Sequence, residues 1–433
     1  MTHPIANPAS TAKPPQRRTR LLPWAKRFDI AVLCFLGLLI ATCDRANISV
    51  AAPSMMREHG WDTTRMGWVL SAFYFGYVAL MIPAGLLADR WGPKITFGLG
   101  VTWWSIFTAL TPLPRSAWSL SIVRALMGAG ESATVPSISA ALARWFPPEE
   151  YSRSSGFSWS GGYAGSVLAF PLASMILKSW GWRAIFYVFA GLGGLWLILW
   201  WTGAYNKPED CRGLSDAELK HIVPSRPLIR EGIATPWALI LRSPAAWAVF
   251  ALHFSSNWFT YVLMSWLPTY LQLARHFSLG KMALGSALPF LSALFATNLF
   301  GALLDRLCRG RNRTRVSKLF LVTFAGAAGL LPLLSRASSP TTIVLLLCVS
   351  AGLMSGATPV YASGALNLVP RFAGSFVGVQ NCIANFAGVL APVVTGYLAA
   401  ARGWNAAFLC TAVVGALGIS AYLLMGKAER AKE

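Results

Sequence analysis

The chain has 433 residues, of which 55% are hydrophobic and only 12% are charged. Soluble domains carry about 25% charged residues, so this composition excludes an ordinary soluble protein and predicts a membrane protein. The formal charge of +21 would also fit a nucleic-acid-binding protein. The basic residues, however, gather on one side of the predicted membrane spans, so we expect no nucleic-acid partner and a lipid bilayer instead.

Apolar stretches of about 20 residues follow one another along the chain, and each can cross about 30 Å of hydrocarbon as a helix. They are too long for the strands of a β-barrel and lack two-residue alternation. We therefore predict an all-α membrane protein with twelve transmembrane helices. The predicted spans are 29–52, 65–87, 95–114, 117–143, 153–178, 182–204, 245–272, 282–304, 316–335, 340–363, 371–398 and 404–425.

The longest polar break separates six spans from six. It contains the segment LSDAELKHI, in which Ser215 is a predicted helix N-cap with Glu218 three residues later. Most of the 37 Lys and Arg residues lie on the side of the termini. This positive-inside bias predicts a multi-pass protein of the plasma or inner cell membrane with both termini cytoplasmic. The predicted organisation is an N-terminal tail (1–28), an N-terminal bundle (29–204), a cytoplasmic linker (205–242), a C-terminal bundle (243–425) and a tail (426–433).

Three sequence segments of the first half recur in the second half, in the same order and at nearly the same offset. The pairs are GLLADRWGPK from Gly85 and GALLDRLCRG from Gly301, AGSVLAFP from Ala164 and AGVLAP from Ala387, and GWRAIF from Gly181 and GWNAAF from Gly403. Such echoes predict two pseudo-symmetric six-helix bundles related by an axis along the membrane normal. This arrangement resembles the major facilitator superfamily, which implies a substrate site near the midplane, between the halves.

The segment GLLADRWGPK also resembles that superfamily's signature between its second and third helices. The resemblance implies a conformational latch at one membrane face, formed by Gly85, Asp89 and Arg90 and by Asp305 and Arg306 of the second copy. Gly85 would permit a close helix approach. A plain topology signal is the alternative interpretation.

Four ionisable residues lie within predicted spans: Asp44, Arg45, Arg124 and Glu131. A charge near the middle of a membrane helix costs about 2.5–3.5 kcal/mol on insertion scales, so such groups usually face a bundle interior or a wet cavity. Arg124 and Glu131 are seven residues apart and point the same way on a helix. Two purely structural ion pairs are the alternative. His253 lies near the start of its span, where we expect an interfacial or packing role.

The segments DRANISVAAP (44–53) and RALMGAGESATVP (124–136) resemble the anion:cation symporter family. That family contains organic-anion/proton symporters and is related to the vesicular and lysosomal organic-anion carriers. The segments SAFYFGYVALMIPAG, SWLPTYL and GVQNCIANFAGVLAP extend the likeness over nearly the whole chain. The resemblance implies that Arg45 binds the substrate carboxylate and that Asp44 and Glu131 take part in proton coupling. Arg124 would then be the partner and switch of Glu131.

Further pocket candidates come from helices that line the central cavity in this superfamily. Neutral amides and phenols there could hydrogen-bond a ligand while Arg45 holds its charge. Each aromatic residue could equally serve packing or the interface belt. Gly162 stands where some similar sugar-acid carriers have a glutamine, which favours a less hydroxylated or a bulkier aromatic carboxylate. The predicted substrate-binding residues are Arg45, Tyr77, Asn257, Tyr261, Tyr361, Asn381 and Asn385.

These observations predict a secondary active transporter that carries out proton-coupled uptake of an organic anion, such as a sugar acid or an aromatic acid, by alternating access. We expect no enzymatic activity, no cofactor, no metal and a monomer. Two alternatives stay open: a proton-driven exporter of an anionic drug or metabolite on the same fold, and a membrane receptor that does not transport. The sequence also leaves open which anion is carried and whether protons or sodium ions drive it.

Overall fold

The computed structural model describes residues 25–211, 213–222, 237–364, 368 and 373–427. All regular elements within these ranges are helices, as predicted. Residues 1–24 of the predicted N-terminal tail, 428–433 of the predicted C-terminal tail, and 212 and 223–236 of the predicted linker lie outside the described residues. Residues 26–28, predicted as tail, already belong to the first helix.

The first half begins with three unbroken helices, and its fourth span is divided into two helices directly after Glu131. The fifth and sixth spans form one helical element with a kink at Gly181, whose φ of 78° is a left-handed conformation that favours glycine. The helices are α1 (Lys26–His59), α2 (Thr63–Trp91), α3 (Pro93–Leu110), α4 (Ala117–Glu131), α5 (Thr134–Trp145) and α6 (Pro148–Gly203).

The second half repeats this plan. Gly403 has a φ of 80° and lies between the last two helices, as Gly181 does in the first half. The repeated GW segments therefore form the same turn twice, which accounts for one of the sequence echoes. The helices are α9 (Pro244–Thr269), which continues as a π-helical turn (Tyr270–Ala274), α10 (Leu279–Cys308), α11 (Arg313–Leu330), α12 (Pro340–Met354), α13 (Thr358–Ala362), α15 (Ala373–Arg402) and α16 (Trp404–Met425).

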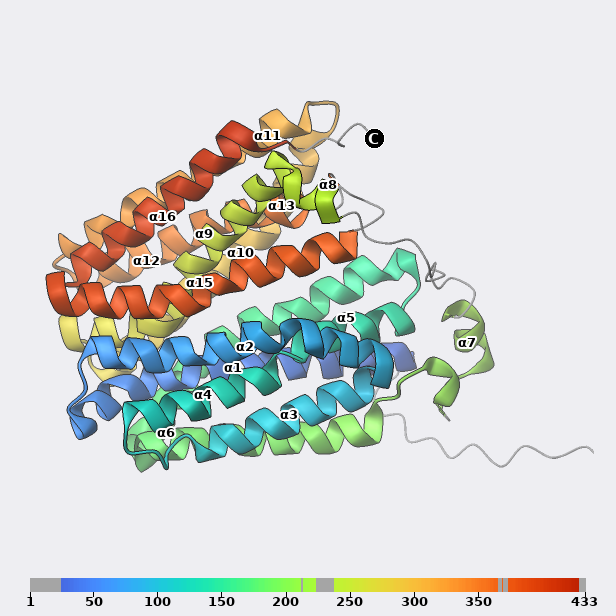
Figure 1. Ribbon diagram of the computed structural model, residues 1–433, viewed down its shortest axis with the longest axis horizontal. Coiled ribbons are helices and arrows are strands. Elements are labelled where there is room, and N and C mark those ends of the chain that lie inside the picture. Colours follow the sequence, from blue (N-terminus) through green and yellow to red (C-terminus); the bar gives the residue numbers. More distant parts are fainter. Residues whose placement is uncertain (1–24, 212, 223–236, 365–367, 369–372, 428–433) are drawn as a thin grey trace, which may run out of the picture.

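Figure 1 shows the first half, in blue to green, lying beside the second half, in yellow to red. Seven helices among the described residues are long and apolar enough to cross a membrane, and α6 contains two spans. The arrangement agrees with the predicted fold of twelve spans in two six-helix bundles. We call the end of the molecule with the start of α1 and with the linker helices α7 (Asp216–Ile222) and α8 (Trp237–Arg242) the linker face. The opposite end, where α1 turns into α2, is the far face.

Close packing of α2 against α4 depends on glycines. A Cβ on Gly76 would overlap the carbonyl oxygen of Ala125, and a Cβ on Gly128 would overlap that of Phe73. Any larger residue would push the two helices apart. This crossing brings the part of α4 that carries Arg124 and Glu131 against α2.

The two halves meet closely near the far face. The Thr63 hydroxyl donates a hydrogen bond of 2.8 Å to the carbonyl oxygen of Gly396 on α15. A Cβ on Gly67 would lie 2.9 Å from the carbonyl oxygen of Pro392. Backbones of α2 and α15 therefore approach each other at the far-face end, across the boundary between the halves.

The predicted linker helix is present as α7. The Ser215 hydroxyl accepts a hydrogen bond of 3.2 Å from the backbone N–H of Glu218, as expected for an N-cap. The Glu218 carboxylate, however, reaches the start of α1 and accepts from the backbone N–H groups of Lys26 and Arg27, at 3.2 and 3.0 Å. The linker thus supplies the N-terminal cap of α1, which satisfies N–H groups that no helix can pair internally.

Candidate functional site

An ion pair joins the first helix to the fourth span in the interior of the first half. The Nε of Arg45, on α1, donates to Oε1 of Glu131, at the end of α4. The Glu131 side chain is fully buried, and that of Arg45 is 14% exposed. The Arg45 guanidinium also lies over the ring of Tyr77, 4.7 Å from its centroid, and 5.7 Å from that of Phe73. Three helices, α1, α2 and α4, therefore hold this pair.

This pairing corrects one prediction from the sequence. Arg124 was expected to be the partner of Glu131, but Glu131 pairs with Arg45 instead. Seven residues of helix rise about 10 Å, so two side chains that share a face of one helix are still two turns apart. Arg45 reaches Glu131 from the neighbouring helix. Arg124 lies over Phe73, 5.0 Å from the ring centroid, and its Nη1 is 2.9 Å from the sulfur of Met127.

Asp44 is fully buried and points elsewhere than its neighbour Arg45. Its Oδ1 accepts a hydrogen bond of 3.3 Å from the amide of Asn47, one turn along α1. Several buried atoms of the four charged residues have no hydrogen-bond partner among the described residues: Asp44 Oδ2, Arg45 Nη2, Arg124 Nε and Glu131 Oε2. Unpaired buried polar atoms are rare and unfavourable, so these four atoms single this region out as a candidate functional site.

A cavity of about 310 Å³ lies between the two halves. Thr42 and Arg45 line it from α1, and Asn257 and Tyr261 line it from α9. Tyr361 of α13 lines it as well. Arg45 is the only charged side chain among the described lining residues, whereas Asp44, Arg124 and Glu131 lie behind the wall. The cavity therefore offers a ligand one guanidinium, several hydroxyl groups and the Asn257 amide, within a wall that is largely apolar.

The remaining predicted pocket residues lie around this cavity without lining it. Tyr77 is buried beneath the Arg45 guanidinium. Asn385 accepts a hydrogen bond of 2.5 Å from the Tyr261 hydroxyl and donates one of 2.8 Å to the carbonyl oxygen of Asn381. Asn385 therefore holds Tyr261, and the side chain of Asn381 is not among those that line the cavity.

A polar contact in the second half was missed by sequence reasoning. The His253 ring stacks on Tyr361, with centroids 4.1 Å apart and planes 11° apart. The amide nitrogen of Gln380 lies 3.1 Å from Nδ1 of His253 and donates to the carbonyl oxygen of Tyr361 at 3.2 Å. Of the two roles expected for His253, interfacial or packing, this contact is the packing role, and it supports a tyrosine that lines the cavity. A histidine within a span was the available signal, but its partners come from two other helices.

Among the described residues, no hydrogen bond or ion pair joins the predicted latch residues across the halves. Asp89 lies at the end of α2, where its carbonyl oxygen accepts from Arg144 of the same half at 3.4 Å. Asp305 pairs with Arg313 of its own half at 3.9 Å, and both Arg90 and Arg306 are exposed. A Cβ on Gly85 would meet only Pro136, at 4.0 Å, so the expected close helix approach is absent here. The described contacts join the halves near the far face and at mid-helix positions, as between Tyr163 and Thr297, away from these residues.

Comparisons with known proteins agree with this fold and site. Residues 34–392 match the Major Facilitator Superfamily. The chain is 34% identical over 418 residues to the ascorbate transporter, chloroplastic, of Arabidopsis thaliana, covering 94% of this chain and 77% of the relative. It is 35% identical over 396 residues to the sodium-dependent phosphate transport protein 1, chloroplastic, of the same plant, covering 90% and 77%.

Human sialin is 27% identical over 463 residues, with 95% of this chain and 94% of sialin covered. A solved structure of a bacterial homologue of the human lysosomal transporter Spinster, in an inward-facing and occupied conformation, superposes with a TM-score of 0.75. That match covers 92% of this chain and 97% of the other at 20% identity, and it supports the fold alone.

The two six-helix halves and the cavity between them define a membrane transporter rather than an enzyme. The chain belongs to the Major Facilitator Superfamily. Its similarity to anion transporters and to sialin confirms the resemblance to the anion:cation symporter family that the helix motifs indicated.

These relatives also correct the predicted location. The sequence analysis placed the chain in the plasma or inner cell membrane with cytoplasmic termini, and this is wrong: both plant relatives are named as chloroplastic, which points to an organellar envelope membrane. The positive-inside bias distinguishes one membrane face from the other but does not identify the membrane. We therefore name the two sides only as the linker face and the far face.

Proposed function

We propose that this transporter moves an organic anion together with a proton, in the direction of uptake, and that a carboxylate is the group it recognises. The coarser statement, an anion transporter of the major facilitator type, is supported by relatives named for anion, ascorbate and phosphate transport. The finer proposal rests on one observation, that Arg45 lines the central cavity and is paired with the buried acid Glu131 behind it.

The Arg45–Glu131 pair gives a physical reason for coupling. While Glu131 is ionised it neutralises Arg45, and an incoming anion competes with it for the guanidinium. Protonation of Glu131 removes that competitor and leaves a buried cation that an anion can compensate. Binding of a proton and of an anion therefore favour each other, and loss of the proton returns Arg45 to Glu131 and releases the cargo. Asp44, also fully buried, would be the second proton-responsive acid.

The volume of the cavity favours a small substrate. A volume of about 310 Å³ is at the lower end of the range for ligand sites. Gly162 lines the wall, and a Cβ there would find its nearest neighbours, Leu38 and Thr42, at 3.6 Å. The space beside Thr42 is thus left without the amide that some similar sugar-acid carriers have.

Two further expectations from the sequence stay predictions: that the protein is a monomer, and that the latch residues close the linker face.

Transport in proteoliposomes tests this proposal. With an imposed pH gradient, wild-type protein should accumulate a labelled carboxylate on the alkaline side, and a panel of sugar acids, aromatic acids and phosphate should identify the preferred anion. Glu131→Gln should abolish accumulation and retain exchange of anion for anion. Glu149→Gln removes an exposed acid at the linker face and should change neither.

Several outcomes would contradict the proposal. Accumulation driven by a sodium gradient and indifferent to pH would favour sodium-dependent transport, a possibility raised by the phosphate transporter among the relatives. Extrusion of the anion against its gradient would favour an exporter. Ligand binding without any flux would favour a receptor, and pH-driven accumulation that survives in Glu131→Gln would remove this residue from the coupling step.

A further inference from the structure

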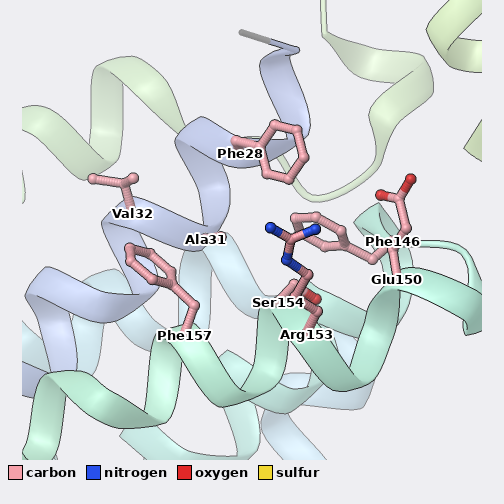
Figure 2. A pocket seen from close by; sticks show the side chains of 8 residues that line it. All are labelled: Phe28, Ala31, Val32, Phe146, Glu150, Arg153, Ser154 and Phe157. Carbon is pink, nitrogen blue, oxygen red and sulfur yellow. The ribbon is translucent and has the colours of Figure 1, made fainter.

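The central cavity, rather than a second hollow in the first half, is the place where one anion can be distinguished from another. That hollow, of about 400 Å³, lies where the start of α1 meets α6, and Glu150 and Arg153 both line it (Figure 2). Its opposite charges give it no preference for an anion. The central cavity has Arg45 as the one charged side chain among its described lining residues, so its other walls must distinguish one carboxylate from another.

Tyr361 lines this cavity from a segment that is not part of a regular long helix. It belongs to α13 (Thr358–Ala362), five residues that continue α12 through a 3₁₀ turn (Ser355–Ala357). A 3₁₀ stretch within a helix often marks a hinge. The last carbonyl groups of a helix also lack N–H partners within it. Contacts from other helices must therefore decide where the Tyr361 ring lies.

Two side chains from other helices supply these contacts. His253 of α9 covers one face of the Tyr361 ring, with centroids 4.1 Å apart and planes 11° apart. The amide nitrogen of Gln380, on α15, donates to the carbonyl oxygen of Tyr361 at 3.2 Å and lies 3.1 Å from Nδ1 of His253. Gln380 is 3% exposed, so these hydrogen bonds are shielded from water. Together the two side chains hold both the backbone and the ring of Tyr361.

The Tyr361 carbonyl oxygen fixes the orientation of the Gln380 amide. The amide oxygen would be repelled there, so the amide nitrogen takes that place and donates one hydrogen to the carbonyl and the other to His253. Nδ1 of His253 therefore accepts, and the neutral ring carries its proton on Nε2. A second proton, on Nδ1, would face the amide hydrogen and break this arrangement. His253 thus holds Tyr361 as a neutral ring and does not carry protons.

We propose that His253 and Gln380 are positioning residues that set the anion selectivity of the transporter by holding Tyr361 in the cavity wall. The proposal rests on the proposed function, in which Arg45 binds the carboxylate. Arg45 lines the cavity from the first half and Tyr361 from the second, so the remainder of the anion meets the tyrosine. A ring that cannot swing back limits the size of that remainder. In a cavity of about 310 Å³ this favours short carboxylates.

The ratio of the apparent affinities for two acids tests the proposal. Lactate and phenyllactate share a carboxylate and an α-hydroxyl group and differ by one phenyl ring, and thermal-shift titrations of the purified full-length protein report both affinities. His253→Ala should shift the ratio about tenfold toward phenyllactate, because Tyr361 can then move into the space of the lost imidazole. His253→Phe keeps a ring against Tyr361 and should keep the wild-type ratio. If His253→Ala does not fold, Gln380→Met replaces it, with a shift in the same direction.

Controls separate positioning from a general structural role, which would weaken the binding of both acids by the same factor. His59→Ala is the matched control, because His59 stacks on Trp61 at 4.6 Å between centroids and neither is among the described lining residues. In a Tyr361→Ala background, His253→Ala should leave the ratio as it is, since it acts through the tyrosine. His253→Phe should retain pH-driven accumulation in proteoliposomes, because the ring carries no proton for coupling.

An unchanged ratio in His253→Ala, or a shift toward lactate, would overturn the proposal and leave the proposed function standing. A further shift when His253→Ala is added to Tyr361→Ala would overturn it as well. Wild-type protein that no sugar acid or aromatic acid stabilises would instead contradict the proposed function, and the selectivity proposal with it.

Discussion

Arg45 is in contact with both parts of the proposed coupling mechanism. It lines the central cavity, and behind the cavity wall its Nε donates to Glu131. Its Nη2 has no hydrogen-bond partner among the described residues. A planar guanidinium can hold one carboxylate at one edge and a second at another, which a single ammonium group cannot do with the same geometry.

We therefore expect Arg45→Lys to weaken anion binding about tenfold or more, because the forked donor arrangement is lost. The apparent affinity can be measured by anion-induced stabilisation in thermal-shift titrations, since a ligand of the native state raises its melting temperature. Arg183→Lys is a matched control, because Arg183 also pairs with a glutamate, Glu58, but at the exposed far face. Near-wild-type affinity of Arg45→Lys would exclude Arg45 from the binding site.

At the scale of elements, the end of α1 is held to the middle of α6 by a polar cluster at the far face. The Glu58 carboxylate accepts from Trp182 Nε1 at 2.8 Å and from both terminal nitrogens of Arg183. Trp182 and Arg183 directly follow the kink at Gly181. These bonds, chiefly those from Arg183, lower the pKa of Glu58 to about 2. The cluster fixes where the sixth span begins relative to the first.

This lowered pKa predicts a pH-dependent contribution to stability. Because the folded pKa lies below the value of about 4.3 for an unperturbed glutamate, the contribution is present above that pH and is lost as the pH falls toward 2. The melting temperature of wild type should therefore exceed that of Glu58→Gln at pH 7, and the difference should shrink at pH 3.5. The effect should be small, since the Arg183 and Glu58 side chains are 49% and 40% exposed. A difference that does not change with pH would contradict this assignment.

At the scale of the whole molecule, alternating access requires the contacts between α2 and α15 at the far face to separate. Their backbones are in direct contact, since Thr63 donates to the Gly396 carbonyl oxygen and Gly67 packs on Pro392. Within the part of the chain that the structure describes, the latch residues at the linker face are not paired across the halves. This combination describes a conformer that is closed at the far face, and the predicted latch would act in the opposite conformer.

Gly396→Val should destabilise this conformer, because its Cβ would overlap the backbone carbonyl oxygen of Thr63, which no rotamer change can relieve. Spin labels at the exposed positions 65 and 402, near the far-face ends of α2 and α15, should report a longer distance in this variant. Gly329→Val is the control, because a Cβ at Gly329 meets nothing within 4 Å. An unchanged distance distribution in Gly396→Val would show that this contact does not hold the far face closed.

The sequence by itself determined the spans, the two repeated halves and the set of buried charges. These are local properties: apolar length sets a span, and a glycine with positive φ sets the turn at Gly181 and again at Gly403. Buried ionisable residues can be recognised in the sequence because a charge within a membrane span costs free energy, so few such residues occur there. The family resemblance then added Arg45 as a predicted substrate contact, and Arg45 lines the central cavity.

Only the tertiary structure decided which of these residues meet. It paired Glu131 with Arg45 rather than Arg124, placed Asn385 behind Tyr261, and brought His253 and Gln380 together against Tyr361. Partner choice between helices depends on their rotation and on how closely they cross, and glycine contacts such as Gly76 with Ala125 set that crossing. Periodicity along one helix shows which way a side chain points, but which neighbour lies there depends on the packing of all the helices together.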